Sequence, residues 1–302
     1  MRDWHAGDAE AVDIREASIR SLACGDELQE GIVSYASGLT EVLGDNLRGV
    51  YLYGSLARGC HHPATSDVDV IVVTREDCPE EQHSAILEMH ERAGDPVDAV
   101  FVTHDQANAD VFPTPVGFLV KPLGRLPRRA QSALNEIART QKWAVDDPIS
   151  SDYRIVRVPE GRGDFLLQRQ DAYEAGIALV GTDPCEIIRP VPWPLLAENL
   201  DFLFPHIIPN FKNSVLMLCR IAYAHTHHGL CCKRHAGEWA LEALDERWRP
   251  MIEAALARYS QGIAGNAESP SVRQEFEGYC AGYISSLPSN RGIVCSSSEL
   301  SD

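Results

Sequence analysis

Residues 47–73 read LRGVYLYGSLARGCHHPATSDVDVIVV, in which two apolar runs flank a polar connection. The runs at 47–53 and 67–73 are short and rich in aliphatic or aromatic residues, a composition that is typical of β-strands. A third run of this kind lies at 96–102, and an exposed helix is predicted before it, over 79–93. The order strand, loop, strand, helix, strand indicates an α/β domain.

Helical patterns surround this segment on both sides. Apolar residues spaced three to four positions apart predict a helix over 26–43 that is ended by Gly44. A helix near 128–143 and a strand at 153–158 are also expected. All later elements are expected to be helices, at 165–180, 193–203, 211–228, 234–244, 247–261 and 270–286.

The chain has 302 residues, which is more than a single hydrophobic core usually organises, so two domains are expected. We predict an α+β protein in which an N-terminal α/β domain with a mixed sheet is followed by a C-terminal helical bundle. The expected ranges are a polar lead-in at 1–25, the α/β domain at 26–160, the helical domain at 161–287 and a serine-rich disordered tail at 288–302.

The formal net charge is −17, which disfavours nucleic acids and anionic membranes as partners, because binding them requires a basic surface. The same charge would attract a cationic small molecule, although it could equally serve solubility alone. The N-terminus lacks the apolar core of a secretory signal, and no apolar run approaches the length of a spanning helix. We therefore expect a cytoplasmic protein, as a monomer or weak homodimer.

Two aspartates, Asp67 and Asp69, open the second predicted strand. Residues two apart on a strand point to the same face, so their carboxylates are expected to lie close together. Like charges at short range repel, and a divalent cation relieves that repulsion. Hard oxygen ligands of this type suit Mg²⁺.

The turn at Gly54 and Ser55 is a candidate phosphate site, because glycine allows close approach to the backbone and the amides and hydroxyl can donate to phosphate oxygens. Arg58 and Lys233 are candidates to neutralise a triphosphate, with a solvated loop arginine as the alternative for Arg58. Asp98 lies within the third apolar run, where an unpartnered charge would be costly.

Asp98 could therefore complete a two-metal site with the other two aspartates or act as a general base. A simple strand-end charge is the alternative reading of Asp98. Its neighbour Asp95 is the alternative candidate for the third carboxylate.

These features together resemble the polymerase-β-like nucleotidyltransferase superfamily, and within it the aminoglycoside adenylyltransferases of the streptomycin and spectinomycin type. The first part of the resemblance is the strand and turn at 50–55 followed by 66–69, which identifies the superfamily. The second part is more specific and consists of ALVG at 178–181, PVP at 190–192, NSVLMLCRIAY at 213–223, Lys233 and EWA at 238–240.

The resemblance implies that the 26–160 region is the nucleotidyltransferase domain, that ATP is the co-substrate and that two Mg²⁺ ions take part. It also implies Asp67 and Asp69 as Mg²⁺ ligands, Asp98 at the position of the catalytic base, and Arg220 and Lys233 as phosphate contacts. The family usually has glutamate as the base, so Asp98 is one methylene shorter.

The expected reaction is transfer of AMP to a hydroxyl of a small cationic substrate, and the resemblance favours an aminoglycoside or aminocyclitol antibiotic. Streptomycin-modifying members carry a tryptophan and an acidic residue before the helix expected at 211–228, and this chain has FLFPHIIPN at 202–210 instead. The alternative is AMPylation of a protein partner, as in some toxin–antitoxin members of the superfamily.

Overall fold

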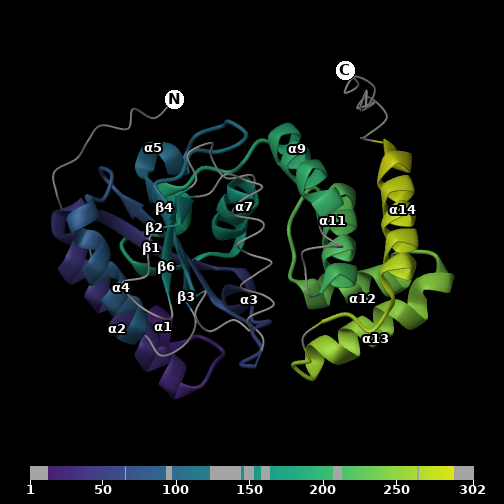
Figure 1. Cartoon of the computed structure of the whole chain (residues 1–302), viewed down its shortest axis with the longest axis horizontal. Coiled ribbons are helices and arrows are strands. Elements are labelled where there is room, and N and C mark those ends of the chain that lie inside the picture. Colours follow the sequence, from purple (N-terminus) through teal and green to yellow (C-terminus); the bar gives the residue numbers. More distant parts are fainter. Residues whose placement is uncertain are drawn as a thin grey trace. The chain divides into compact units, whose positions relative to one another are not determined.

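The computed structural model describes residues 13–64, 66–92, 97–122, 144–145, 153–157, 164–206, 213–263 and 265–288 (Figure 1). The chain forms two compact units. The first comprises residues up to His61 together with Ser66–Asn199, and the second comprises His62–Thr65 and Leu200–Asp302. The division thus falls near residue 200, whereas the composition predicted a boundary near 160, a position that lies outside the described residues.

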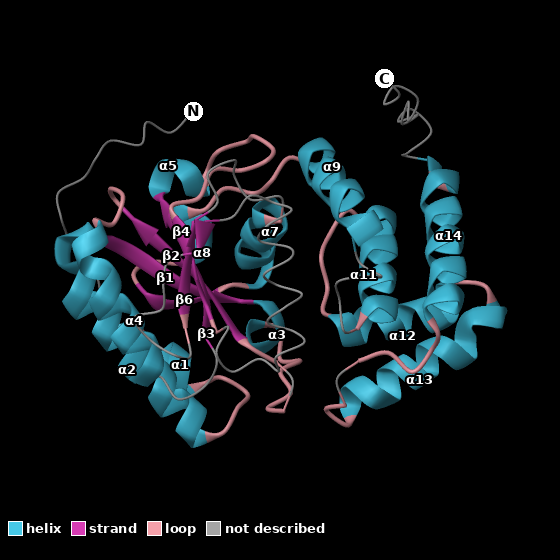
Figure 2. Cartoon of the chain, in the orientation of Figure 1, coloured by secondary structure: helices cyan, strands magenta, loops and turns pink. Residues whose placement is uncertain are grey.

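The first unit is built on a seven-stranded sheet with the order β5-β6-β4-β3-β2-β1-β7 (Figure 2). Its strands are β1 Leu47–Tyr53, β2 Val68–Thr74, β3 Val97–Thr103, β4 Phe118–Lys121, β5 Ala144–Val145, β6 Arg154–Arg157 and β7 Ile177–Val180. Strands β2 and β3 are parallel and the other neighbouring pairs are antiparallel, so the predicted mixed sheet is confirmed.

Side chains of the central strands alternate between two hydrophobic layers. On one face, Val68, Val70 and Val72 of β2 pack with residues of α2 (Asp26–Leu43) and α4 (His83–Arg92). On the other face, Ile71 and Val73 belong to a cluster with residues of α7 (Phe165–Ala175). The helices α2 and α4 therefore cover one side of the sheet and α7 covers the other (Figure 1).

The predicted helix over 26–43 is confirmed as α2, and Gly44 follows it with φ +49°, a value that side chains disfavour. The helix predicted over 79–93 begins later, at His83, and Ile86 and Leu87 are buried rather than exposed. The described part of this unit also contains the short α-helices α1 Glu16–Arg20, α3 Gly54–Ala57, α5 His104–Ala107 and α8 Pro184–Ile187.

Two features of the periphery of this unit were not predicted. The polar lead-in expected at 1–25 contains α1, whose Ile19 is fully buried, and Ile14 forms a bridge with Val180. The helix expected over 165–180 ends at Ala175, and 177–180 forms β7, which pairs antiparallel with β1. The physical reason is that Gly176 adopts an extended conformation and the following residues, Ile-Ala-Leu-Val, complete the sheet edge.

The second unit is helical, as predicted. After α9 (Trp193–Leu203), which crosses the division, come α11 Ser214–His227, α12 Lys233–Ala243, α13 Arg249–Ser260 and α14 Pro270–Ser286. Helix α11 contacts α12, α13 and α14, and its Leu216, Leu218 and Cys219 are buried. Within the described part of the chain, no helix is both long and apolar enough to cross a membrane.

A buried histidine gives the first unit a predictable response to acid. His90 is fully buried, its Nδ1 donates to the Ile86 carbonyl at 2.8 Å, and its Nε2 accepts from the Tyr35 hydroxyl at 3.0 Å. Burial lowers the pKa of His90 from 6.5 to about 4. Between these values the unfolded chain binds a proton that the folded chain does not, so stability falls as pH falls.

We expect this single group to remove about 3 kcal/mol from the free energy of unfolding between pH 6.5 and 4. Urea unfolding at pH 7 and at pH 4 would measure the loss. The control is Tyr35→Phe/His90→Leu, which replaces both hydrogen-bonding partners with apolar groups and should reduce the pH dependence. An equal loss of stability in the wild type and the double variant would contradict this assignment.

Candidate active site

Asp69 and Asp98 lie next to each other at one end of the sheet. In the parallel pair of β2 and β3, Asp69 is in register with Asp98, and in the antiparallel pair of β1 and β2 it is opposite Tyr53. Neighbouring strands are about 4.8 Å apart, so the two carboxylates extend from adjacent positions of one face. Asp67 precedes β2 by one residue and is exposed. The structure thus brings together Asp69 and Asp98, two of the three carboxylates that the sequence predicted.

The turn after β1 lets Asp69 take its position. Gly54 has φ +73°, and a Cβ placed on it would collide with the carboxylate of Asp69. Glycine is therefore required here by the neighbouring aspartate as well as by the backbone conformation. From the sequence, this glycine was predicted to allow phosphate approach only, and the contact with Asp69 is an additional reason for it.

The first turn of α3 is held by a helix that the sequence argument did not connect with it. The Gly54 amide donates to Asp171 Oδ2 at 2.8 Å, and Arg58 Nε donates to Asp171 Oδ1 at 2.8 Å. Arg58 Nη2 also donates to Glu174 Oε2 at 3.0 Å. The side chain of Arg58 is 16% exposed, so it is not a solvated loop arginine.

These contacts change what the turn can offer to a ligand. The Gly54 amide already has an acceptor in Asp171. Burial alone would lower the pKa of Arg58, but the carboxylates of Asp171 and Glu174 raise it above its usual value. A phosphate contact by Arg58 stays a prediction, and it would require the guanidinium to share its pairing with α7.

Asp98 has a partner that the sequence argument missed. Lys121 Nζ donates to Asp98 Oδ1 at 2.6 Å and also contacts Oδ2. Both side chains are largely buried, with 14% of Lys121 and 19% of Asp98 exposed. The available signal was a lysine directly after the apolar run at 118–120, but no strand was predicted there and the pairing is distant in sequence.

The carboxylates fit the way in which Mg²⁺ is usually held beside a nucleotide. Across the described residues, no group of three or more His, Cys, Asp and Glu side chains is arranged as a metal cage. Mg²⁺ at phosphate-transfer sites is commonly bound through one or two carboxylates and the substrate phosphates, without such a cage. Asp69 and Asp98 offer oxygen donors of this kind, and the exposed Asp67 precedes Asp69 by two residues in the chain.

The two basic residues expected from the helical domain both lie in the second unit. Arg220 is a half-buried residue of α11, and Lys233 is the first residue of α12, which packs against α11. Their contact with phosphate stays a prediction.

A mixed sheet that presents adjacent aspartates beside a Gly-Ser turn, followed by a helical unit, defines the class of nucleotidyltransferases. Residues 39–123 match the family described as "Nucleotidyltransferase domain". Residues 193–281 match the family described as "Aminoglycoside adenylyltransferase, C-terminal domain". The chain therefore belongs to the aminoglycoside adenylyltransferase family.

Similarity to individual proteins extends over most of the chain. It is 26% identical over 284 residues to an "Aminoglycoside (3'') (9) adenylyltransferase" of Escherichia coli, covering 86% of this chain and 99% of the relative. It is 21% identical over 236 residues to a "Spectinomycin 9-adenylyltransferase" of Campylobacter jejuni, covering 76% and 84%, respectively.

A solved structure shares the fold. It is a spectinomycin adenyltransferase from Enterococcus faecialis, crystallised with ATP and spectinomycin. The TM-score is 0.63 at 18% identity, and the match covers 84% of this chain and 98% of that one.

The contact between Gly54 and Asp69 leads to a prediction with a matched control. Gly54→Ala should lower AMP transfer about 100-fold, because the new methyl group displaces the Asp69 carboxylate. Gly59 also has positive φ, at +64°, but a Cβ there has open space around it. Gly59→Ala should therefore cost about 1–2 kcal/mol of stability and leave transfer within a few-fold of wild type.

Steady-state rates of both variants, corrected for the folded fraction, provide the comparison. Equal losses of activity in Gly54→Ala and Gly59→Ala would show that backbone strain, and not the position of Asp69, is responsible.

Proposed function

We propose that the chain transfers AMP from ATP to a hydroxyl of a small cationic acceptor of the aminoglycoside or aminocyclitol class, with Mg²⁺. The observation that carries the proposal is the pairing of Asp69 and Asp98 beside Gly54, in a chain of this family. The named relatives support the choice of acceptor, since they are aminoglycoside and spectinomycin adenylyltransferases.

In the proposed site, Asp67 and Asp69 would hold two Mg²⁺ ions together with the triphosphate, and Asp98 would contribute a third carboxylate. When bound, the ions would neutralise phosphate charge and favour ionisation of the attacking hydroxyl. Gly54 and Ser55 place the backbone of the turn next to the phosphates. Arg58, Arg220 and Lys233 are the basic residues proposed to balance the remaining negative charge.

Asp98 is the proposed general base, and the hydrogen bond from Lys121 holds its carboxylate in place. A carboxylate has about four acceptor positions, so Asp98 can accept from the ammonium of Lys121 and still accept a proton from the acceptor hydroxyl. The positive charge of Lys121 also offsets the repulsion between Asp98 and Asp69. A base of this kind must reach the hydroxyl directly or through one water.

The acceptor class follows from charge and from family. A protein with net charge −17 attracts polycations electrostatically. Spectinomycin or a related aminocyclitol is the preferred acceptor. Streptomycin is less favoured, because the residues before α11 lack the tryptophan and the acidic residue expected of streptomycin-modifying members.

A panel of aminoglycosides and aminocyclitols, tested with ATP and Mg²⁺ for pyrophosphate release, examines the proposal. Wild-type protein should release pyrophosphate with spectinomycin or a close relative and should raise resistance in a sensitive bacterium. Asp98→Asn should lose transfer by at least about 100-fold while still binding ATP, because an amide cannot take up the proton.

Asp95→Asn, the neighbouring carboxylate in the sequence, is the control and should retain transfer. Loss of transfer in Asp95→Asn with retention in Asp98→Asn would reassign the base. Labelling of a lysate protein with AMP, without modification of any antibiotic, would replace this proposal with protein AMPylation.

A further inference from the structure

Helix α7 carries three consecutive polar residues that are all buried. Arg169, Gln170 and Asp171 are 0%, 9% and 2% exposed, respectively, on a helix that covers one face of the sheet. Buried polar groups are costly unless each of them has hydrogen-bonding partners. The partners of these three residues therefore show what the helix is built to hold.

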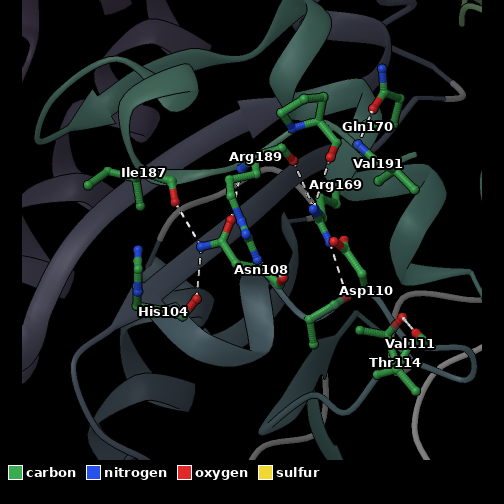
Figure 3. A network of polar contacts seen from close by, with 12 residues as sticks. His104, Asn108, Asp110, Val111, Thr114, Arg169, Gln170, Ile187, Arg189 and Val191 are labelled. Carbon is green, nitrogen blue, oxygen red and sulfur yellow. Dashed lines mark hydrogen bonds and ion pairs between the residues drawn. The ribbon is translucent and has the colours of Figure 1, made fainter. Parts of the chain in front are cut away.

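The first two residues anchor α7 to loops at one end of the sheet. Arg169 donates to the carbonyls of Ala109 at 3.0 Å, Arg189 at 2.9 Å and Pro190 at 3.1 Å, and it pairs with Asp110 at 2.9 Å (Figure 3).

Gln170 Oε1 accepts from the Val191 amide at 2.8 Å, and the loop is tied further by Asn108 (Figure 3). Together these contacts fix the rotation and the height of α7 on the sheet.

The third residue faces the other way, toward the turn after β1. Asp171 accepts from the Gly54 amide with one oxygen and from Arg58 Nε with the other, both at 2.8 Å. Its side chain is only 3% exposed, so both bonds are made in a setting shielded from water. Hydrogen bonds to an ionised acceptor are shorter and stronger than neutral ones, which suits a residue that must hold a backbone in place.

The turn that Asp171 holds is also the neighbour of Asp69. Gly54 lies so close to the Asp69 carboxylate that a methyl group would not fit between them. A shift of the Gly54 backbone would therefore change the space available to Asp69. Asp171 of α7 thus binds the amide of Gly54, and the Cα of the same residue lies against the carboxylate of Asp69, the proposed metal ligand.

We propose that Asp171 is a positioning residue for the nucleotidyl-transfer site. It fixes the Gly54 turn through the backbone amide, and through that turn it fixes the Asp69 carboxylate, while Arg169 and Gln170 hold α7 in register. This inference rests on the proposed function, because it assigns Asp171 to the geometry of that reaction. A purely structural ion pair between α3 and α7 is the competing explanation.

The chain contains a matched control for that explanation. Glu174 lies one helical turn beyond Asp171 and binds the same arginine, with Nη2 to Oε2 at 3.0 Å, but no described contact joins it to Gly54. Its other oxygen accepts from Gln170 Nε2 at 3.0 Å, a bond that the amide oxygen of Glu174→Gln can still accept. Removing the charge of Glu174 weakens the ion pair of Arg58 and leaves the amide contact intact. A structural role predicts similar effects at 171 and 174, whereas the positioning role predicts an effect on kinetics at 171 only.

The experiment compares Asp171→Asn, Asp171→Ala and Glu174→Gln in the full chain. Transfer kinetics, the melting temperature and the affinity for a non-hydrolysable ATP analogue with Mg²⁺ are measured for each. Asp171→Ala should lower kcat about 100-fold, and Asp171→Asn, which keeps one acceptor for the Gly54 amide, about 10-fold. Glu174→Gln should stay within about threefold of wild type, with a melting temperature close to that of Asp171→Asn.

A double-mutant cycle tests the route through the turn. In a Gly54→Ala background, where Asp69 is already displaced, Asp171→Asn should have little additional effect on kcat, because residues that act as a unit are non-additive. Additive losses would overturn the inference. So would wild-type kcat and KM in folded Asp171→Asn, or equal kinetic losses in Asp171→Asn and Glu174→Gln.

The readouts separate this inference from the proposed function. A wild-type chain that neither binds the ATP analogue nor transfers AMP overturns both. A wild-type chain that transfers AMP to an aminocyclitol, with Asp171 variants that match it in kcat and in nucleotide affinity, overturns the positioning role alone.

Discussion

The structure depends on one unfavourable arrangement, the placement of two carboxylates in register on neighbouring parallel strands. Asp69 and Asp98 extend from one face of the sheet at adjacent positions, and like charges in that relation repel. Such a pair persists only when the surrounding groups supply positive charge and a rigid frame. The described contacts supply both, with Lys121 on Asp98 and the Gly54 turn against Asp69.

The rigid frame comes from the sheet itself. Val70 and Val72 of β2, with Ala99 and Phe101 of β3, are buried under α2 and α4, so neither strand can shift its register without exposing its core face. The opposite face is shared between an apolar layer under α7 and the polar end that carries the aspartates. The face of the sheet under α2 and α4 thus stabilises the fold, and the opposite face carries the aspartates of the proposed reaction.

Local sequence patterns predicted the elements and site residues whose signals lie within a short stretch of chain. The first three strands, helix α2, the aspartates and the Gly-Ser turn all follow from period, composition and spacing within a few dozen residues. Lys121 and Asp171 were not found, because they reach the site through pairings 23 and 117 residues away in the chain. Strand β7 was missed for a similar reason, since Ile177–Val180 continues a helical pattern and becomes a strand only by pairing with β1.

The central claim is that Asp69, held by the turn and paired with Asp98, binds the metal that carries the nucleotide. Binding of Mn²⁺, as a spectroscopic substitute for Mg²⁺, can be followed by electron paramagnetic resonance in the presence of a non-hydrolysable ATP analogue. We expect Mn²⁺ to bind the wild-type complex at least about tenfold more tightly than the Asp69→Asn complex, a difference of about 1.4 kcal/mol. Identical Mn²⁺ titrations of the two folded proteins would contradict the account.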